Sequence, residues 1–147
     1  MSAKQADRAS DSNLNELNSD SPSLSTTRPA KTRIDRFSFG SIRVDDVTYE
    51  YDVMISGDEV RKRKKRPSKP FRDAFGHTPL SLGEDIPWDC ERLVIGTGAN
   101  GSLPVMDEVK AEAARRRVEL VIVPTEEAIR FLAAGPKDTN AILHVTC

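Results

Sequence analysis

Three short apolar runs in the second half of the chain alternate with two helical patterns, and this order restricts the fold. The runs occupy residues 93–95, 118–123 and 140–146. Residues 104–117 and 125–134, between them, carry apolar side chains at helical spacing. Such a β-α-β-α-β unit, whose crossovers are right-handed, produces parallel strands. We expect both helices to pack on the sheet through Val105, Met106, Val109, Ile129 and Leu132.

The first half predicts additional strands and a long connection. Residues 36–42 and 47–55 alternate apolar and polar side chains, as an antiparallel β-hairpin does. Residues 57–91 show little periodicity and predict a long basic loop. The expected fold is therefore a single three-layer α/β domain over residues 34–147, with a mixed sheet, an N-terminal β-hairpin and a β-α-β-α-β half. Residues 1–33 are rich in Ser, Asn, Asp and Thr and predict a disordered tail.

Composition narrows the class of protein. No apolar run reaches the length that a membrane-spanning helix needs. Two cysteines, Cys90 and Cys147, form no disulfide framework, which favours a reducing, cytoplasmic compartment. The formal net charge is −1, but residues 61–72 hold eight basic side chains and no acidic one. The chain is therefore an acidic domain with one concentrated basic segment, and not a generally basic nucleic-acid binder.

The glycine-rich segment 96–104 has the spacing G-x-G-x-x-G after a strand and before a helix. A dinucleotide fingerprint needs its helix to start inside the glycines, whereas Pro104 marks a later start. No lysine follows the glycines, which excludes a P-loop. Two interpretations remain: a tight turn that needs positive φ, or a small-anion site built from backbone N–H groups at Gly98, Asn100, Gly101 and Ser102, with the Ser102 hydroxyl available as a helix cap.

The basic run is the strongest charge feature. Its six consecutive cations are Arg61, Lys62, Arg63, Lys64, Lys65 and Arg66. They could bind an acidic protein surface or the phosphates of a nucleic acid, or form a solvated loop that balances the acidic remainder. Aromatic residues follow the run and are not interleaved with it, so base stacking is not indicated. An acidic protein is the favoured partner, and nucleic acid is the alternative.

Histidine and cysteine positions predict neither a metal site nor a nucleophile. We expect His144 and Cys147 on a strand, where residues three apart point to opposite faces. Cys147 has no neighbouring cation in the sequence that would activate it. His77, in a Gly-His-Thr-Pro loop, is the one weak candidate for an acid or base, and nothing brings it together with Thr97 and Asp52. No metal, cofactor or catalytic residue is therefore assigned.

Several blocks together resemble one family. They are His77-Thr78-Pro79-Leu80-Ser81, GTGANGSLPV, VPTEEAI and the terminal NAILHVTC. The chain resembles the small α/β domain of adipogenesis-associated proteins and of a mitochondrial complex I assembly factor, which also has bacterial and archaeal members. The resemblance covers residues 34–147 and implies a compact three-layer α/β fold with a mixed sheet. It implies no reaction, and the basic run resembles a feature of a bacterial branch.

These features predict a non-catalytic interaction or assembly module that presents its basic loop to an acidic partner. The alternative is a binder or enzyme that acts on a phosphate or carboxylate ligand at the glycine-rich segment, with His77 as acid or base. The sequence predicts no membrane association and leaves the oligomeric state open.

Overall fold

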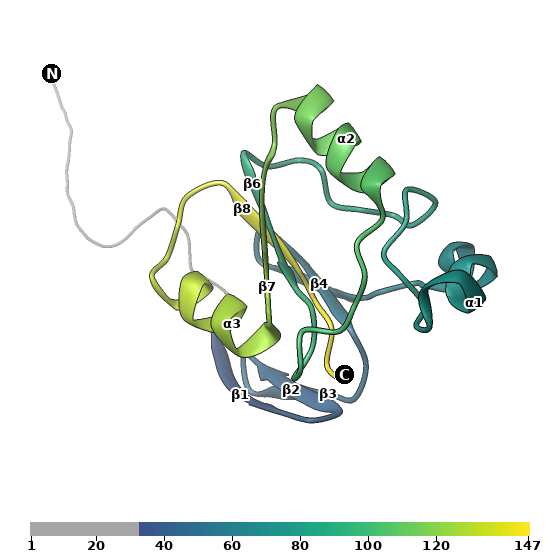
Figure 1. Cartoon of the computed structure of the whole chain (residues 1–147). Helices are drawn as coiled ribbons and strands as arrows, with labels where there is room; N and C mark the ends of the chain where they lie inside the picture. Colours follow the sequence, from purple (N-terminus) through teal and green to yellow (C-terminus); the bar gives the residue numbers. More distant parts are fainter. Residues whose placement is uncertain (1–32) are drawn as a thin grey trace, which may run out of the picture. The chain divides into compact units, whose positions relative to one another are not determined.

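The computed structural model describes residues 33–147, and the predicted disordered tail lies outside them except for Arg33. These residues form two sheets and several helices (Figure 1). The elements in chain order are β1 (Ile34–Ser38), β2 (Ser41–Val44), β3 (Val47–Tyr49), β4 (Val53–Ser56), β5 (Glu59–Lys62), a 3-10 helix η1 (Arg66–Phe71), α1 (Arg72–Phe75), β6 (Arg92–Gly96), α2 (Asp107–Arg116), β7 (Glu119–Val123), α3 (Thr125–Ala133) and β8 (Thr139–Leu143).

The larger sheet is mixed, as predicted. Its strand order is β5-β4-β8-β6-β7. Strand β6 pairs in parallel with both β7 and β8, which confirms the β-α-β-α-β half. The β4 strand pairs antiparallel with β5 and β8. The carboxyl ends of β6 and β8 therefore lie side by side, and the segments that follow these two strands meet at one edge of the sheet.

Alternation along each central strand divides the core between two faces. Leu93 and Ile95 pack in a cluster with Val109 of α2, whereas Val94 packs in a second cluster with Ala128 of α3. The second cluster also contains Ile42 and Val44 of the smaller sheet, among other residues. The larger sheet is thus the middle layer of a three-layer α/β domain, as predicted. Val109 of α2 lies in the first cluster and Ile129 and Leu132 of α3 pack against the second, as expected for the two helices. Val105 and Met106 also pack against the first cluster, but they lie before the start of α2.

The N-terminal half contains the expected antiparallel hairpin, formed by β2 and β3, but its strands are divided differently from the expectation. Strands β1, β2 and β3 form an antiparallel three-stranded sheet, with tight turns before Ser41 and at Asp45–Asp46. Residues 47–55, expected as one strand, divide between β3 and β4 in different sheets. The alternation of 47–55 hides this break because Tyr51 continues it between Glu50 and Asp52. Residues 57–91 are also not one loop, since they include β5, η1 and α1.

The helix after the glycine-rich segment begins at Asp107, three residues later than expected. Residues 104–106 are held in an extended bridge beside Leu80, whose N–H donates to the Pro104 carbonyl and whose carbonyl accepts from the Met106 N–H. Within residues 33–147, no helix combines the length and the apolar composition needed to cross a bilayer.

Candidate functional site

The glycine-rich loop encloses another part of the same chain. Ala99 N–H donates to the Thr146 carbonyl at 2.7 Å, and the N–H groups of Asn100 and Ser102 donate to the Cys147 carbonyl oxygen at 3.0 and 3.2 Å. Gly98 N–H donates to the Thr125 hydroxyl at 2.8 Å. The loop that follows β6 therefore holds the segment that follows β8.

Gly98 is required by this close approach. Its φ is +104°, and a Cβ atom placed there would lie 2.3 Å from the Cys147 carbonyl carbon and 2.5 Å from the Thr146 carbonyl oxygen. Gly101 N–H donates to the Gly98 carbonyl at 3.2 Å, which closes a tight turn. The turn interpretation of the glycines agrees with this geometry.

The anion-site interpretation needs free N–H groups, and the structure does not offer them at this loop. The N–H groups of Gly98, Asn100, Gly101 and Ser102 all donate to the chain itself. Ser102 also cannot cap α2, because the cap position is Met106 and no side chain bonds there. Ligand binding at this loop stays a prediction, and it would require displacement of the 146–147 segment.

The basic run divides into a buried residue and exposed ones. Arg63 was expected to bind a partner with the rest of the run, but it is only 2% exposed and cannot contact one. Arg61 pairs with Asp85 at 3.0 Å, and the Lys62 ammonium lies 5.0 Å from the centre of the Tyr51 ring. Beyond the strand, the exposed cations are Lys64, Lys65, Arg66, Lys69 and Arg72.

Arg63 is the centre of a buried ionic network. Its Nε and Nη2 donate to the two carboxylate oxygens of Glu84, each at 2.7 Å, and its Nη1 donates to Asp52 Oδ2 at 2.8 Å. Nη2 also donates to the Pro79 carbonyl at 3.0 Å. Burial alone would lower the pKa of Arg63, but the pairs with Glu84 and Asp52 outweigh burial and raise this pKa above its usual value.

The same network fixes the base of the basic segment. Ser68 of η1 is fully buried, and its hydroxyl donates to Glu84 Oε2. Since that bond uses the only Ser68 hydroxyl proton, the Ser81 hydroxyl donates to Ser68 Oγ, at 2.6 Å. The η1–α1 pair is thereby attached to the body of the domain through one buried serine.

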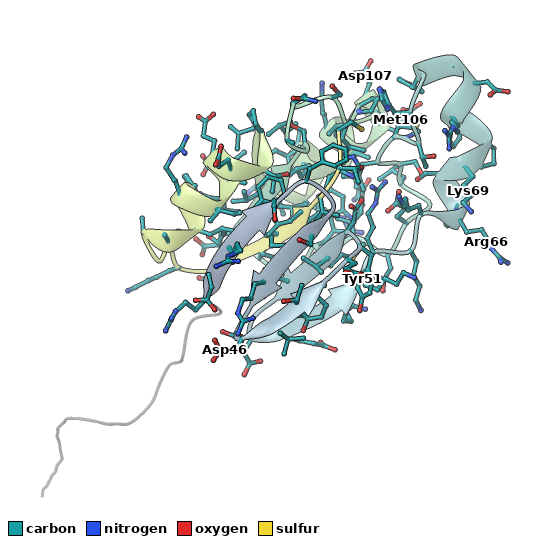
Figure 2. All side chains as sticks on the ribbon, turned by 90° about the horizontal axis from the view of Figure 1, so that it is seen from below. Asp46, Tyr51, Arg66, Lys69, Met106 and Asp107 are labelled. Atoms are coloured by element: carbon teal, nitrogen blue, oxygen red, sulfur yellow. The ribbon has the colours of Figure 1, made fainter. Side chains whose placement is uncertain are left out.

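The outer side of η1 and α1 forms what we term the basic knob, defined as residues 64–75. Figure 2 shows Arg66 and Lys69 projecting from it into solvent. Phe71 and Phe75 are 39% and 42% exposed on the same short helices. In both views α1 and α3 lie on opposite sides of the described domain. The basic knob therefore combines cations with exposed aromatic surface.

A Cys-His-Asp arrangement lies beside this network, and it was missed at the sequence level. Asp52 Oδ2 is 2.8 Å from His144 Nδ1, and His144 Nε2 is 3.3 Å from Cys147 Sγ. The exposed His77 places its Nδ1 3.4 Å from the same sulfur. The expectation that His144 and Cys147 point to opposite faces is wrong, because β8 ends at Leu143 and the chain then turns out of the strand.

Asp52 is held in its ionised form. Burial would raise its pKa, but a hydrogen bond and charge from His144, the Val145 N–H at 2.9 Å and the Arg63 charge together lower the pKa to about 2. The combination of Thr97, His77 and Asp52 that was considered from the sequence does not form, since Asp52 pairs with His144 and the Thr97 hydroxyl donates to the Val123 carbonyl.

The other cysteine has a different environment. Cys90 Sγ donates to the Pro87 carbonyl at 3.4 Å, and burial raises the pKa of its thiol. Within the part of the chain that the structure describes, no group of three His, Cys, Asp or Glu side chains is arranged to hold a metal ion.

Comparison with known proteins assigns the chain to a class. Residues 34–141 match the sequence profile of the family described as "Protein of unknown function (DUF498/DUF598)". The chain belongs to this family. A search of curated proteins found no match.

Solved structures share the fold. The conserved hypothetical protein PH1505 from Pyrococcus horikoshii OT3 is 29% identical, with a TM-score of 0.68 over 78% of this chain and 99% of that one. A protein named MT938 is 23% identical, with a TM-score of 0.60 over 80% and 100% of the two chains. A Bordetella pertussis protein described as a Mth938-like domain is 19% identical, with a TM-score of 0.51 over 84% and 92%. This likeness supports the α/β fold.

Proposed function

We propose that this protein is an interaction or assembly module that binds an acidic protein partner through the basic knob. The observation that carries the proposal is the exposure of Lys64, Lys65, Arg66, Lys69 and Arg72 around Phe71 and Phe75. Exposed cations steer an acidic partner, and exposed aromatic side chains supply contact area that a solvated charge loop lacks.

The anchoring of the knob supports binding by a preformed surface. Ser68 and the Arg63–Glu84 pair attach the short helices to the sheet, so less ordering entropy is lost on association. We place the protein in the cytoplasm, where its free Cys90 and Cys147 would remain reduced. The resemblance to the adipogenesis-associated and complex I assembly proteins favours an assembly role over catalysis.

The proposal is tested by quantitative pull-down from source cells with three baits. They are the wild type, the Arg66→Gln/Lys69→Gln variant of the knob, and an Arg130→Gln/Lys137→Gln control. Arg130 and Lys137 lie outside the knob, and the control removes the same two charges. We expect the wild type and the control to retain the same acidic proteins, and the knob variant to lose them. Identical partner lists for all three baits would contradict the proposal, and recovery of RNA in place of protein would favour the nucleic-acid alternative.

A further inference from the structure

The Cys147 thiol lies between two imidazoles at the edge of the sheet. Its sulfur is 3.3 Å from His144 Nε2 and 3.4 Å from His77 Nδ1. The Cys147 backbone is fixed by the N–H groups of Asn100 and Ser102, and the residue is half-buried. A half-buried thiol in a fixed position beside two bases is open to a small reagent.

The orientation of His144 determines which of its nitrogens accepts a proton. Asp52 Oδ2 accepts a hydrogen bond from His144 Nδ1 at 2.8 Å and from Arg63 Nη1 at 2.8 Å. An ionised carboxylate cannot donate, so His144 Nδ1 carries a proton. In the neutral imidazole, Nε2 is then an acceptor, and Cys147 Sγ at 3.3 Å and the Thr146 hydroxyl at 3.1 Å both lie within reach of it. The nucleophile, the base and the carboxylate that orients the base thus lie one after another in space.

The surrounding charge favours a reagent of one sign. His77 follows α1 directly through Gly76, and α1 opens with Arg72, the last cation of the basic segment. Eight cations precede His77 within residues 61–72. Arg63 is neutralised by its buried partners, Arg61 pairs with Asp85, and Asp73 is the one acidic residue between Arg72 and His77, so positive charge still predominates. An anionic reagent is therefore attracted to the side of the sulfur on which His77 lies.

We propose that Cys147 is a reactive thiol that undergoes exchange with low-molecular-weight anionic disulfides, with His144 as its base and Asp52 as a positioning residue. His144 Nε2 accepts the thiol proton, and the resulting thiolate attacks one sulfur of the disulfide. The reagent's S–S bond breaks as the new S–S bond to Cys147 forms, and the departing thiolate takes the proton from the His144 imidazolium. The product is a mixed disulfide, and no further oxidant is consumed. This site does not depend on the proposed partner of the basic knob.

Cys90 provides an internal reference for the test. Stopped-flow rates with the dianionic disulfide 5,5′-dithiobis(2-nitrobenzoate) are measured at neutral pH on the full chain carrying Cys90→Ser or Cys147→Ser. We expect Cys147 to react at least about tenfold faster than Cys90. Burial raises the pKa of the Cys90 thiol, and its hydrogen-bond partner is a carbonyl, which cannot accept the thiol proton as a base does. Equal rates would overturn the proposal.

Substitution of each histidine separates the base from a bystander. In the Cys90→Ser chain, His144→Asn should lower the Cys147 rate by roughly tenfold, and His77→Asn by less, because Asp52 orients only His144. The reverse order, or no effect of His144→Asn, would overturn the proposal. The same histidine substitutions in the Cys147→Ser chain are the control for unfolding, because unfolding would speed the reaction of Cys90. If His144→Asn speeds the reaction of Cys90, the proposal is decided by the comparison of the Cys90→Ser and Cys147→Ser chains with both histidines present.

The charge preference is tested with Arg72→Gln and the control Arg130→Gln. We expect Arg72→Gln to slow the reaction with the dianionic reagent about twofold or more, and to leave the rate with neutral 4,4′-dithiodipyridine unchanged. Equal slowing with both reagents, or the same effect of Arg130→Gln, would contradict the preference for anions.

Discussion

Removal of the Arg63 guanidinium should destabilise the domain severely, although the residue belongs to a run of surface-type charges. In Arg63→Met the apolar stem is kept, but the Asp52 and Glu84 carboxylates lose their buried partner. Breaking a buried ion pair by removing one partner costs about 3–5 kcal/mol. For a domain of roughly 115 residues, an unfolding entropy of about 2.1 cal/mol/K per residue converts this into a Tm decrease of roughly 12–20 °C.

Urea denaturation followed by circular dichroism, together with thermal melts, measures the effect against Lys64→Met as the control. Lys64 is the next residue and is exposed, so its loss should change the free energy of unfolding by less than about 0.5 kcal/mol. Arg63→Lys keeps a charge but cannot bond both oxygens of Glu84, and it should fall between the two. A loss below about 1 kcal/mol in Arg63→Met would refute the assignment of a buried network.

The remaining predictions concern pH, the glycine-rich loop and its side chains. The pKa of Asp52 in the folded protein is about 2, below its ordinary 3.8, so its ionised form contributes on the order of 2 kcal/mol to the free energy of unfolding above pH 4. This contribution is lost as the pH falls from about 4 to 2. Urea midpoints at pH 5, 3 and 2 measure the loss, and a flat profile would contradict it. Gly98→Ala should lower the free energy of unfolding by more than about 2 kcal/mol, because the new Cβ clashes with the 146–147 segment. Gly40→Ala, also at positive φ but with open space around it, should cost about 1 kcal/mol. Equal losses in thermal melts would argue against the close approach of the 146–147 segment to Gly98. Asn100→Ala should change the free energy of unfolding by less than about 0.5 kcal/mol, because Asn100 is exposed and is not among the residues with positive φ; a larger loss would show that its side chain contributes to the turn.

The β-α-β-α-β half was predictable because its signals are local. Buried strands and amphipathic helices are each recognisable within about ten residues, and the crossover rule then fixes their direction. Boundaries were less predictable: Pro104 favours a helix start, but bonds to Leu80, 24 residues earlier, hold it in an extended segment. A threonine at the start of a helix is typical of a cap, yet the Thr125 hydroxyl donates to the His144 carbonyl.

The functional residues depended on contacts between distant segments. Arg63 reads as one more cation in a solvated run, and only Asp52 and Glu84, brought beside it by the fold, reveal that it is buried. The expectation that His144 and Cys147 point to opposite faces assumes that the strand continues to Cys147, whereas β8 ends at Leu143. No periodicity in the sequence reports that stop, because the apolar alternation continues to Val145.

The central claim is that the basic knob recognises an acidic protein surface, and a direct binding measurement tests it. Fluorescence anisotropy with a labelled oligoglutamate peptide, titrated with the wild type, should show binding that weakens as salt is added. The Arg66→Gln/Lys69→Gln variant should bind roughly fivefold or more weakly, and the Arg130→Gln/Lys137→Gln control should match the wild type. Equal affinity of the knob variant and the control, or tighter binding of an oligouridylate of the same charge than of the peptide, would contradict the account.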